Sequence, residues 1–66
     1  MQVWINGDRR ELPDGAGVRE VLDELGAPST GVAVAVDGLV VPRAAWAHTA
    51  LADGARIEVL TAVQGG

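Results

Sequence analysis

The N-terminal segment alternates between hydrophobic and polar residues, which is the pattern of a strand with one buried face. Val3 and Ile5 point to one side of this strand, whereas Trp4 points to the other. The dipeptide Asn6-Gly7 favours a tight turn, so residues 10–12 are expected to return as a short second strand. The segment therefore predicts a β-hairpin that carries Trp4 on the face away from the core.

Three further strands are predicted in the second half of the chain. Residues 31–36 alternate valine with glycine or alanine, and Asp37-Gly38 predicts a turn into a short strand over residues 39–41. The last predicted strand spans residues 56–63 and also alternates. In that strand Leu60 lies on the face away from the core.

One amphipathic helix is predicted between the two groups of strands. Its hydrophobic residues recur at i, i+3, i+4 and i+7 and share one stripe: Val18, Val21, Leu22 and Leu25. Gly17 occupies the expected N-terminal cap, where glycine is weaker than a side chain that accepts hydrogen bonds. Arg19 and Asp23 are spaced for an exposed ion pair. A helical turn followed by a loop is expected within residues 43–52.

The order of these elements is strand, strand, helix, strand, strand, short turn, strand, which predicts an α+β domain. A single helix covers only one face of a sheet, so its hydrophobic stripe is expected to pack there and leave the other face open. We expect a mixed sheet of four to five strands. Residues 1–63 are predicted to form one domain, followed by a flexible tail of residues 64–66.

The composition narrows the classes of function. The chain has 66 residues, of which 48% are hydrophobic, and it has no cysteine, so disulfides and thiolate metal sites are excluded. All five basic residues are arginines, and the formal net charge of −4 disfavours nucleic-acid binding. No apolar run approaches the roughly 20 residues that cross a bilayer. We expect a cytoplasmic protein without a secretion signal, monomeric when free.

Side chains suited to catalysis are sparse and unpaired. His48 is the only histidine, and acid–base or triad chemistry needs a second group oriented beside it. The acidic residues of the predicted helix fit a solvated face better than a metal site. Residues 15–17 form a glycine-rich turn, but no lysine follows them as in a phosphate-binding loop. We therefore expect no metal, no stably bound cofactor and no enzymatic activity of the chain by itself.

Trp4 and Leu60 are large hydrophobic residues on the face predicted to be open. Contiguous apolar surface is rare on monomeric proteins, so these two residues predict a docking patch for a partner. The alternative is that either side chain packs beneath the loop that follows Pro42.

The sequence ends in Gln64-Gly65-Gly66, directly after a strand predicted to reach Val63. Glycine fits narrow channels because it lacks a Cβ atom, and three extended residues carry a carboxylate about 10 Å. The tail is therefore a candidate acyl carrier with its reactive carboxylate on Gly66. Val63, Gln64 and Gly65 are expected to contact the partner. A frayed polar end is the alternative interpretation.

Short motifs spread over the whole chain match one known family. They are Asn6-Gly7, the Val18-x-x-Val21-Leu22-x-x-Leu25 stripe, Val34-Ala35-Val36-Asp37-Gly38, Val40-Val41-Pro42-Arg43-x-x-Trp46, Asp53-Gly54-x-x-Ile57 and Val63-Gln64-Gly65-Gly66. The chain resembles the ThiS family of bacterial sulfur carriers in the thiamine pathway. The resemblance implies a ubiquitin-like β-grasp fold with the first and last strands parallel and adjacent. Trp4 and Leu60 would then be neighbours.

The resemblance also implies a chemistry for Gly66. An E1-like partner of the ThiF type uses ATP and magnesium to adenylate the terminal carboxylate, and a sulfur-donating protein supplies the sulfur that gives a thiocarboxylate. The thiocarboxylate then donates its sulfur to a thiazole synthase of the ThiG type. In this scheme the carrier provides reach and recognition, and its partners provide catalysis.

Three alternatives remain at this level. The small subunit of molybdopterin synthase, MoaD, shares the fold and the diglycine end, although its chains are usually longer. A protein modifier that forms isopeptide bonds would also end in this way. A plain interaction module would use the open face alone, and its tail would be incidental.

Overall fold

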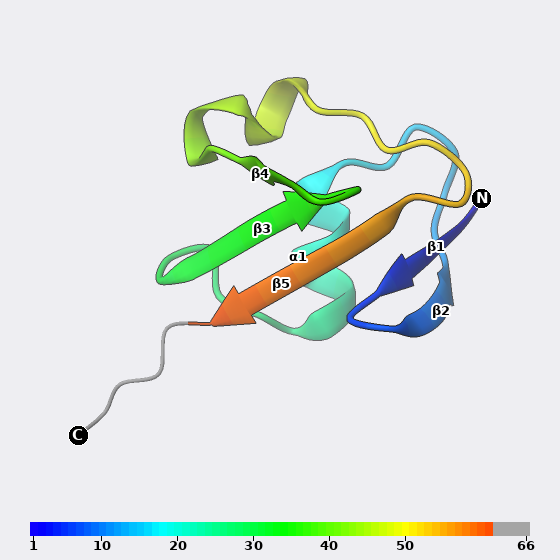
Figure 1. The fold of residues 1–66 in the computed structure, drawn as a ribbon, viewed down its shortest axis with the longest axis horizontal. Coiled ribbons are helices and arrows are strands. Elements are labelled where there is room, and N and C mark those ends of the chain that lie inside the picture. The colour runs from blue at the N-terminus through cyan, green and yellow to red at the C-terminus, as the bar shows by residue number, and fades with distance from the viewer. Residues whose placement is uncertain (62–66) are drawn as a thin grey trace.

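The computed structural model describes residues 1–61, which form five strands and two helical segments (Figure 1). In chain order these are β1 (Gln2–Ile5), β2 (Asp8–Glu11), α1 (Val18–Leu25), β3 (Val32–Val36), β4 (Leu39–Val41), the 3-10 helix η1 (Arg43–His48) and β5 (Arg56–Thr61). The predicted order of elements is confirmed, although β2 begins two residues before the predicted strand. The predictions for Val63, Gln64, Gly65 and Gly66 lie outside the described residues.

The strands form one mixed sheet in the order β2-β1-β5-β3-β4. The sheet contains one parallel pair, β1 with β5, and its other pairs are antiparallel. β5 therefore lies in the centre as the parallel neighbour of β1, as the resemblance implied. Both hairpins turn through residues with positive φ, which are Asn6 (50°) with Gly7 (86°) and Asp37 (51°) with Gly38 (86°). Such turns match the twist of the strands that they join.

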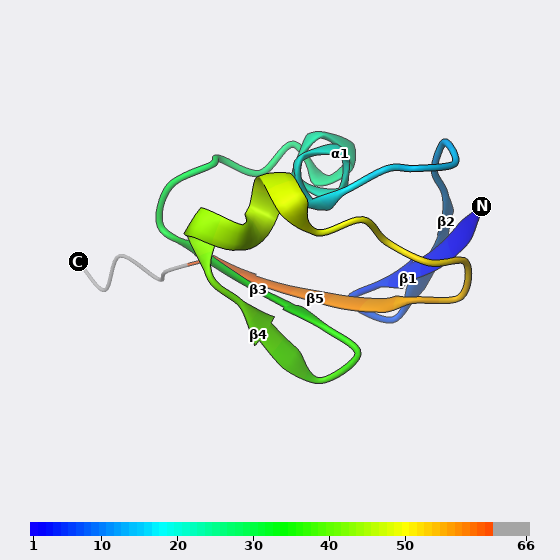
Figure 2. The same ribbon diagram turned by 90° about the horizontal axis from the view of Figure 1, so that it is seen from above.

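The helical segments α1 and η1 lie on the same face of the sheet and leave the other face open (Figure 2). The core lies between these two layers, where hydrophobic residues from the strands, from α1 and from the connecting loops are buried: Val3, Ile5, Leu12, Ala16, Val18, Val21, Leu22, Val34, Leu51, Ala55, Ile57 and Val59. Leu25 and Trp46 pack against this core. The predicted core faces of the strands and of the helix are thus confirmed.

The start of α1 is stabilised by Glu20, whose Oε1 accepts a hydrogen bond of 2.6 Å from the Gly17 N–H. A Cβ atom on Gly17 would lie 3.0 Å from the carbonyl oxygen of Thr49. The loop runs this close because Gly17 forms an isolated β-bridge with Ala50. Glycine at this cap is therefore explained by the close approach of two backbone segments.

The ion pair predicted between Arg19 and Asp23 is wrong. In the described part of the chain the side-chain ion pair of α1 is instead between Glu24 and Arg10 of β2, at 3.3 Å. Arg10 reaches α1 because it is the register partner of Val3, so both side chains point to the helical face. The helix is thus tied to the edge strand of the sheet.

Candidate functional site

β5 is the strand that leads to the predicted reactive end, and the side chains on its two faces differ in their exposure to solvent. Ile57 and Val59 are buried, whereas Glu58 and Leu60 are exposed on the open face. Thr61 pairs with Val32 at the start of β3. The predicted site residues that follow β5 lie outside residues 1–61, so the open face around Leu60 is the part of the site that the structure describes.

The side chain of Asn6 holds β5 in place beyond the end of β1. Its Oδ1 accepts a hydrogen bond of 2.9 Å from the Val59 N–H, and its Nδ2 donates one of 3.3 Å to the Val59 carbonyl oxygen. The Asn6 backbone N–H also donates to the carbonyl oxygen of Ile57 at 2.9 Å. The side chain therefore replaces the next rung of the β1–β5 ladder, a role that the sequence motif did not reveal.

Leu60 belongs to a group of hydrophobic residues on the open face. Leu60 pairs with Ala33 of β3, and Val40 of β4 pairs with Ala35. Side chains of paired residues point to the same face. We call Leu60, Ala33, Ala35 and Val40 the apolar patch, in which Leu60 is 68% and Val40 73% exposed.

Sequence reasoning missed Val40. The two-residue turn at Asp37-Gly38 was the available signal, because a turn of this length fixes Ala35 opposite Val40. The same register places Leu39 opposite Val36, a residue packed against the core, so Leu39 belongs to the other face.

Trp4 is also exposed on the open face, as predicted, but it is not a neighbour of Leu60. Its register partners are Arg9 of β2 and Arg56 of β5. Leu60 lies four residues beyond Arg56, which is about 13 Å along the strand. The adjacency of the two strands was foreseen correctly, but the register separates the two side chains. Neither packs beneath the segment after Pro42, because η1 lies on the opposite face (Figure 2).

The potential metal ligands within residues 1–61 are dispersed over the domain. No group of three or more histidine, cysteine or acidic residues is arranged there to hold a metal ion. His48 is exposed at the end of η1. Among residues 1–61, no helix combines the length and the apolar character that crossing a membrane requires.

The fold defines the class of protein. Two β-hairpins flank the central strand β5, which runs parallel to β1, and one main helix crosses a single face, which is the ubiquitin-like β-grasp arrangement. The family model described as "ThiS family" matches residues 3–66, which is nearly the whole chain. The chain belongs to the ThiS family.

Two curated relatives match over nearly their full length. The sulfur carrier protein ThiS of Thermus thermophilus is 41% identical over an alignment of 69 positions, gaps included, which covers 97% of this chain and 98% of the relative. The sulfur carrier protein ThiS of Escherichia coli is 32% identical over 66 residues and is covered completely. The match therefore extends to whole proteins of the same size.

A third relative is a thiazole synthase from Paramagnetospirillum magneticum. It is 35% identical over 66 residues, which are all of this chain but 20% of that protein. The chain thus spans one fifth of the length of this relative.

Solved structures show the same fold. The crystal structure of the thiamine biosynthesis protein ThiS from Geobacter metallireducens has a TM-score of 0.77 and 33% identity, with both chains fully covered. The solution structure of a thiamine biosynthesis protein from the same organism has a TM-score of 0.80 and 30% identity, and 88% of that chain is covered. The β-grasp assignment therefore has support from experimental structures.

Proposed function

We propose that this chain is a sulfur carrier of thiamine biosynthesis and carries the sulfur as a thiocarboxylate on Gly66. The observation that carries the proposal is the ThiS family match, which runs through the Gly65-Gly66 end. The full-length relatives named as sulfur carrier proteins support it.

A carboxylate needs activation before it can accept sulfur, because its negative charge repels nucleophiles and it lacks a good leaving group. In the proposed reaction an oxygen of the Gly66 carboxylate attacks the α-phosphorus of ATP, and pyrophosphate leaves. The outer sulfur of a persulfide on a donor protein then attacks the carbonyl carbon, and AMP leaves. A thiol next attacks the donor's own sulfur in the resulting acyl disulfide, which forms a disulfide with the donor and releases the thiocarboxylate on Gly66. An E1-like enzyme of the ThiF type binds the ATP and the magnesium and supplies the catalytic groups.

The described residues contribute presentation and recognition to this scheme. β5 runs through the middle of the sheet, and Asn6 fixes its course by two hydrogen bonds to Val59. The apolar patch and Trp4 offer exposed hydrophobic surface to a partner. The chain has no lysine, so it presents no side-chain amine that would capture its own activated carboxyl group.

We propose a thiazole synthase of the ThiG type as the recipient of the sulfur. The relative named thiazole synthase aligns with the whole of this chain over one fifth of its length. A carrier domain and a synthase within one polypeptide are expected to act on the same intermediate, which supports this pairing for the separate chain.

Intact-mass spectrometry after activation tests the proposal. Incubation with the activating enzyme, ATP and a sulfur source should raise the mass by the difference between one sulfur and one oxygen atom, localised to Gly66. A chain that lacks Gly66 should keep its fold and its mass. An unchanged mass of the intact chain, with an enzyme that activates another carrier in parallel, would overturn the proposal. Sulfur delivery to a molybdopterin synthase large subunit in place of the thiazole synthase would overturn its thiamine part.

A further inference from the structure

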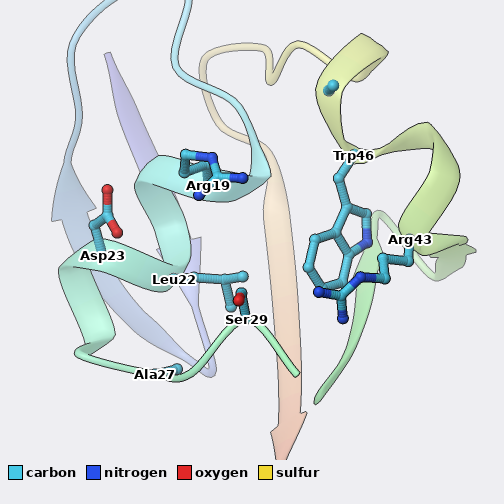
Figure 3. Close-up of a pocket in the computed structure, with 8 residues that line it drawn as sticks. Arg19, Leu22, Asp23, Ala27, Ser29, Arg43 and Trp46 are labelled. Atoms are coloured by element: carbon cyan, nitrogen blue, oxygen red, sulfur yellow. The ribbon is translucent and has the colours of Figure 1, made fainter. Parts of the chain in front are cut away.

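A cleft of about 200 Å³ lies on the helical side of the domain, between α1, η1 and the loop that joins α1 to β3 (Figure 3). Arg19 and Leu22 line it from α1, Ser29 from the loop, and Arg43 and Trp46 from η1. The cleft faces away from the apolar patch, because α1 and η1 cover the opposite side of the sheet (Figure 2). The proposed sulfur chemistry makes no use of it.

Trp46 forms a fixed wall of this cleft. Its Nε1–H donates a hydrogen bond of 3.0 Å to the carbonyl oxygen of Val41, and its ring packs against the core. The guanidinium carbon of Arg43 lies 5.4 Å from the centre of the ring, within the range of a cation–π interaction. The ring restrains the guanidinium and leaves the N–H groups at its edge free to bind an acceptor.

The cleft carries positive charge that the described residues leave unpaired. Within residues 1–61 no carboxylate lies within 4.0 Å of the guanidinium nitrogens of Arg19 or Arg43. Asp23 is the one carboxylate among the lining residues, and Figure 3 shows it on the side of α1 away from Trp46 and Arg43. The local charge is therefore positive in a chain whose formal net charge is −4.

We propose that this cleft binds a single carboxylate side chain of a protein partner. Its volume is smaller than the roughly 300–1,000 Å³ of small-molecule sites, so it suits one side chain better than a metabolite. The guanidinium fork of Arg43 matches the two oxygens of a carboxylate. Leu22 offers an apolar contact for the methylene groups, and Ser29 offers a hydroxyl donor. Arginine and tryptophan are among the residues most enriched at the energetic centres of protein interfaces.

Nuclear magnetic resonance of the ¹⁵N-labelled full chain tests the cleft directly. N-acetylglutamate methylamide should shift the Trp46 indole and Arg43 Nε–H signals in a saturable manner. The neutral glutamine analogue should leave these signals unchanged, and Arg43→Gln should abolish the shift. The absence of a saturable shift in the wild-type chain would overturn the proposal. Tighter binding of inorganic phosphate than of the glutamate probe would overturn the choice of occupant.

Binding to a thiazole synthase tests the docking role, and only the choice of this partner rests on the proposed function. Arg43→Gln should weaken the complex about tenfold. Arg10→Gln removes the same charge from β2, outside both the cleft and the open face, and should change the affinity by no more than about twofold. Asp23→Asn should strengthen the complex, because it removes the negative charge that borders the cleft. Unchanged melting temperatures would show that the variants remain folded.

Different results would contradict the proposal for the cleft and the proposal that the chain is a sulfur carrier. If the wild-type carrier forms the complex and Arg43→Gln binds as tightly, the cleft is not a docking site and the sulfur-carrier proposal is unaffected. If the wild-type carrier forms no complex, the choice of recipient is wrong, and the glutamate titration decides whether the cleft binds a carboxylate.

Discussion

Asn6 shows how much one residue contributes beyond the turn in which it lies. It adopts a positive φ of 50°, which asparagine tolerates better than most residues. Its side chain also binds both backbone groups of Val59. The Asn6-Gly7 motif therefore sets the hairpin and anchors the strand that precedes the predicted reactive end.

The Met1 amino group should make the stability of the domain vary with pH in the alkaline range. It donates hydrogen bonds to Asp14 at 3.1 Å, to Glu11 at 3.3 Å and to the Leu12 carbonyl oxygen at 2.8 Å. The bond to Asp14 raises the pKa of this group above its ordinary value of 8.0; desolvation opposes the rise, and Glu11 adds to it. The folded chain therefore keeps its proton to a higher pH than the unfolded chain. The stabilisation is full below pH 8.0 and is lost as the pH rises through the folded pKa.

We expect the melting temperature to fall as the pH rises above about 8, through the raised pKa of the Met1 amino group. The chain has no lysine, tyrosine or cysteine whose titration would add to this fall. Thermal unfolding at several pH values checks the expectation. The matched control is the same chain acetylated on Met1, which should lose this pH dependence. An equal fall in the acetylated chain would show that the amino group is not its cause.

At the scale of elements, the start of α1 and the loop before β5 approach each other closely because Gly17 has no side chain. We expect Gly17→Ala to lower the free energy of unfolding by about 1–2 kcal/mol, because the new Cβ would crowd the Thr49 carbonyl and alanine is a poor cap. Urea unfolding measures the change. Glycine-to-alanine substitutions without such a contact stabilise by roughly 0.4–1 kcal/mol through the unfolded chain, so a gain in stability would contradict the role of the close approach.

Alternation along the strands predicted which faces are buried, because each side chain follows the two-residue period of a strand. The register between distant strands could not be predicted in this way. The pairing of Trp4 with Arg56 depends on how β1 and β5 align in three dimensions, so the distance from Trp4 to Leu60 appeared only in the structure. The pairing of Arg10 with Glu24 likewise needs the helix placed on the sheet. The four-residue spacing along the helix favoured an ion pair between Arg19 and Asp23 instead.

At the scale of the whole molecule, the residues that stabilise the fold are buried in a small core, whereas the residues proposed to bind partners lie at the surface. Substitutions should therefore affect stability and partner binding separately. Ile57→Ala should lower the free energy of unfolding by about 2–5 kcal/mol, out of roughly 3–10 kcal/mol for a chain of this length. Ile57 is 1% exposed and is one of the largest fully buried side chains of the core. Leu60→Ala on the same strand should change stability by less than about 0.5 kcal/mol, because Leu60 is exposed.

Chemical denaturation of the two variants checks this separation, and partner binding supplies the second measurement. Leu60→Ala should weaken activation by the adenylating enzyme while its unfolding curve matches that of the wild type. Equal destabilisation by the two substitutions would contradict the burial pattern of β5.

The central position of β5 has a consequence for synthesis on the ribosome. β5 joins the β1–β2 hairpin to the β3–β4 hairpin, and β5 is the last of these strands to be translated. Until Arg56–Thr61 are available for pairing, the nascent chain can form only two separate hairpins, which are marginally stable alone. The open face is therefore assembled only after translation has passed Thr61. Prematurely terminated chains that lack β5 cannot display the assembled face, so we expect them not to compete for the proposed partners.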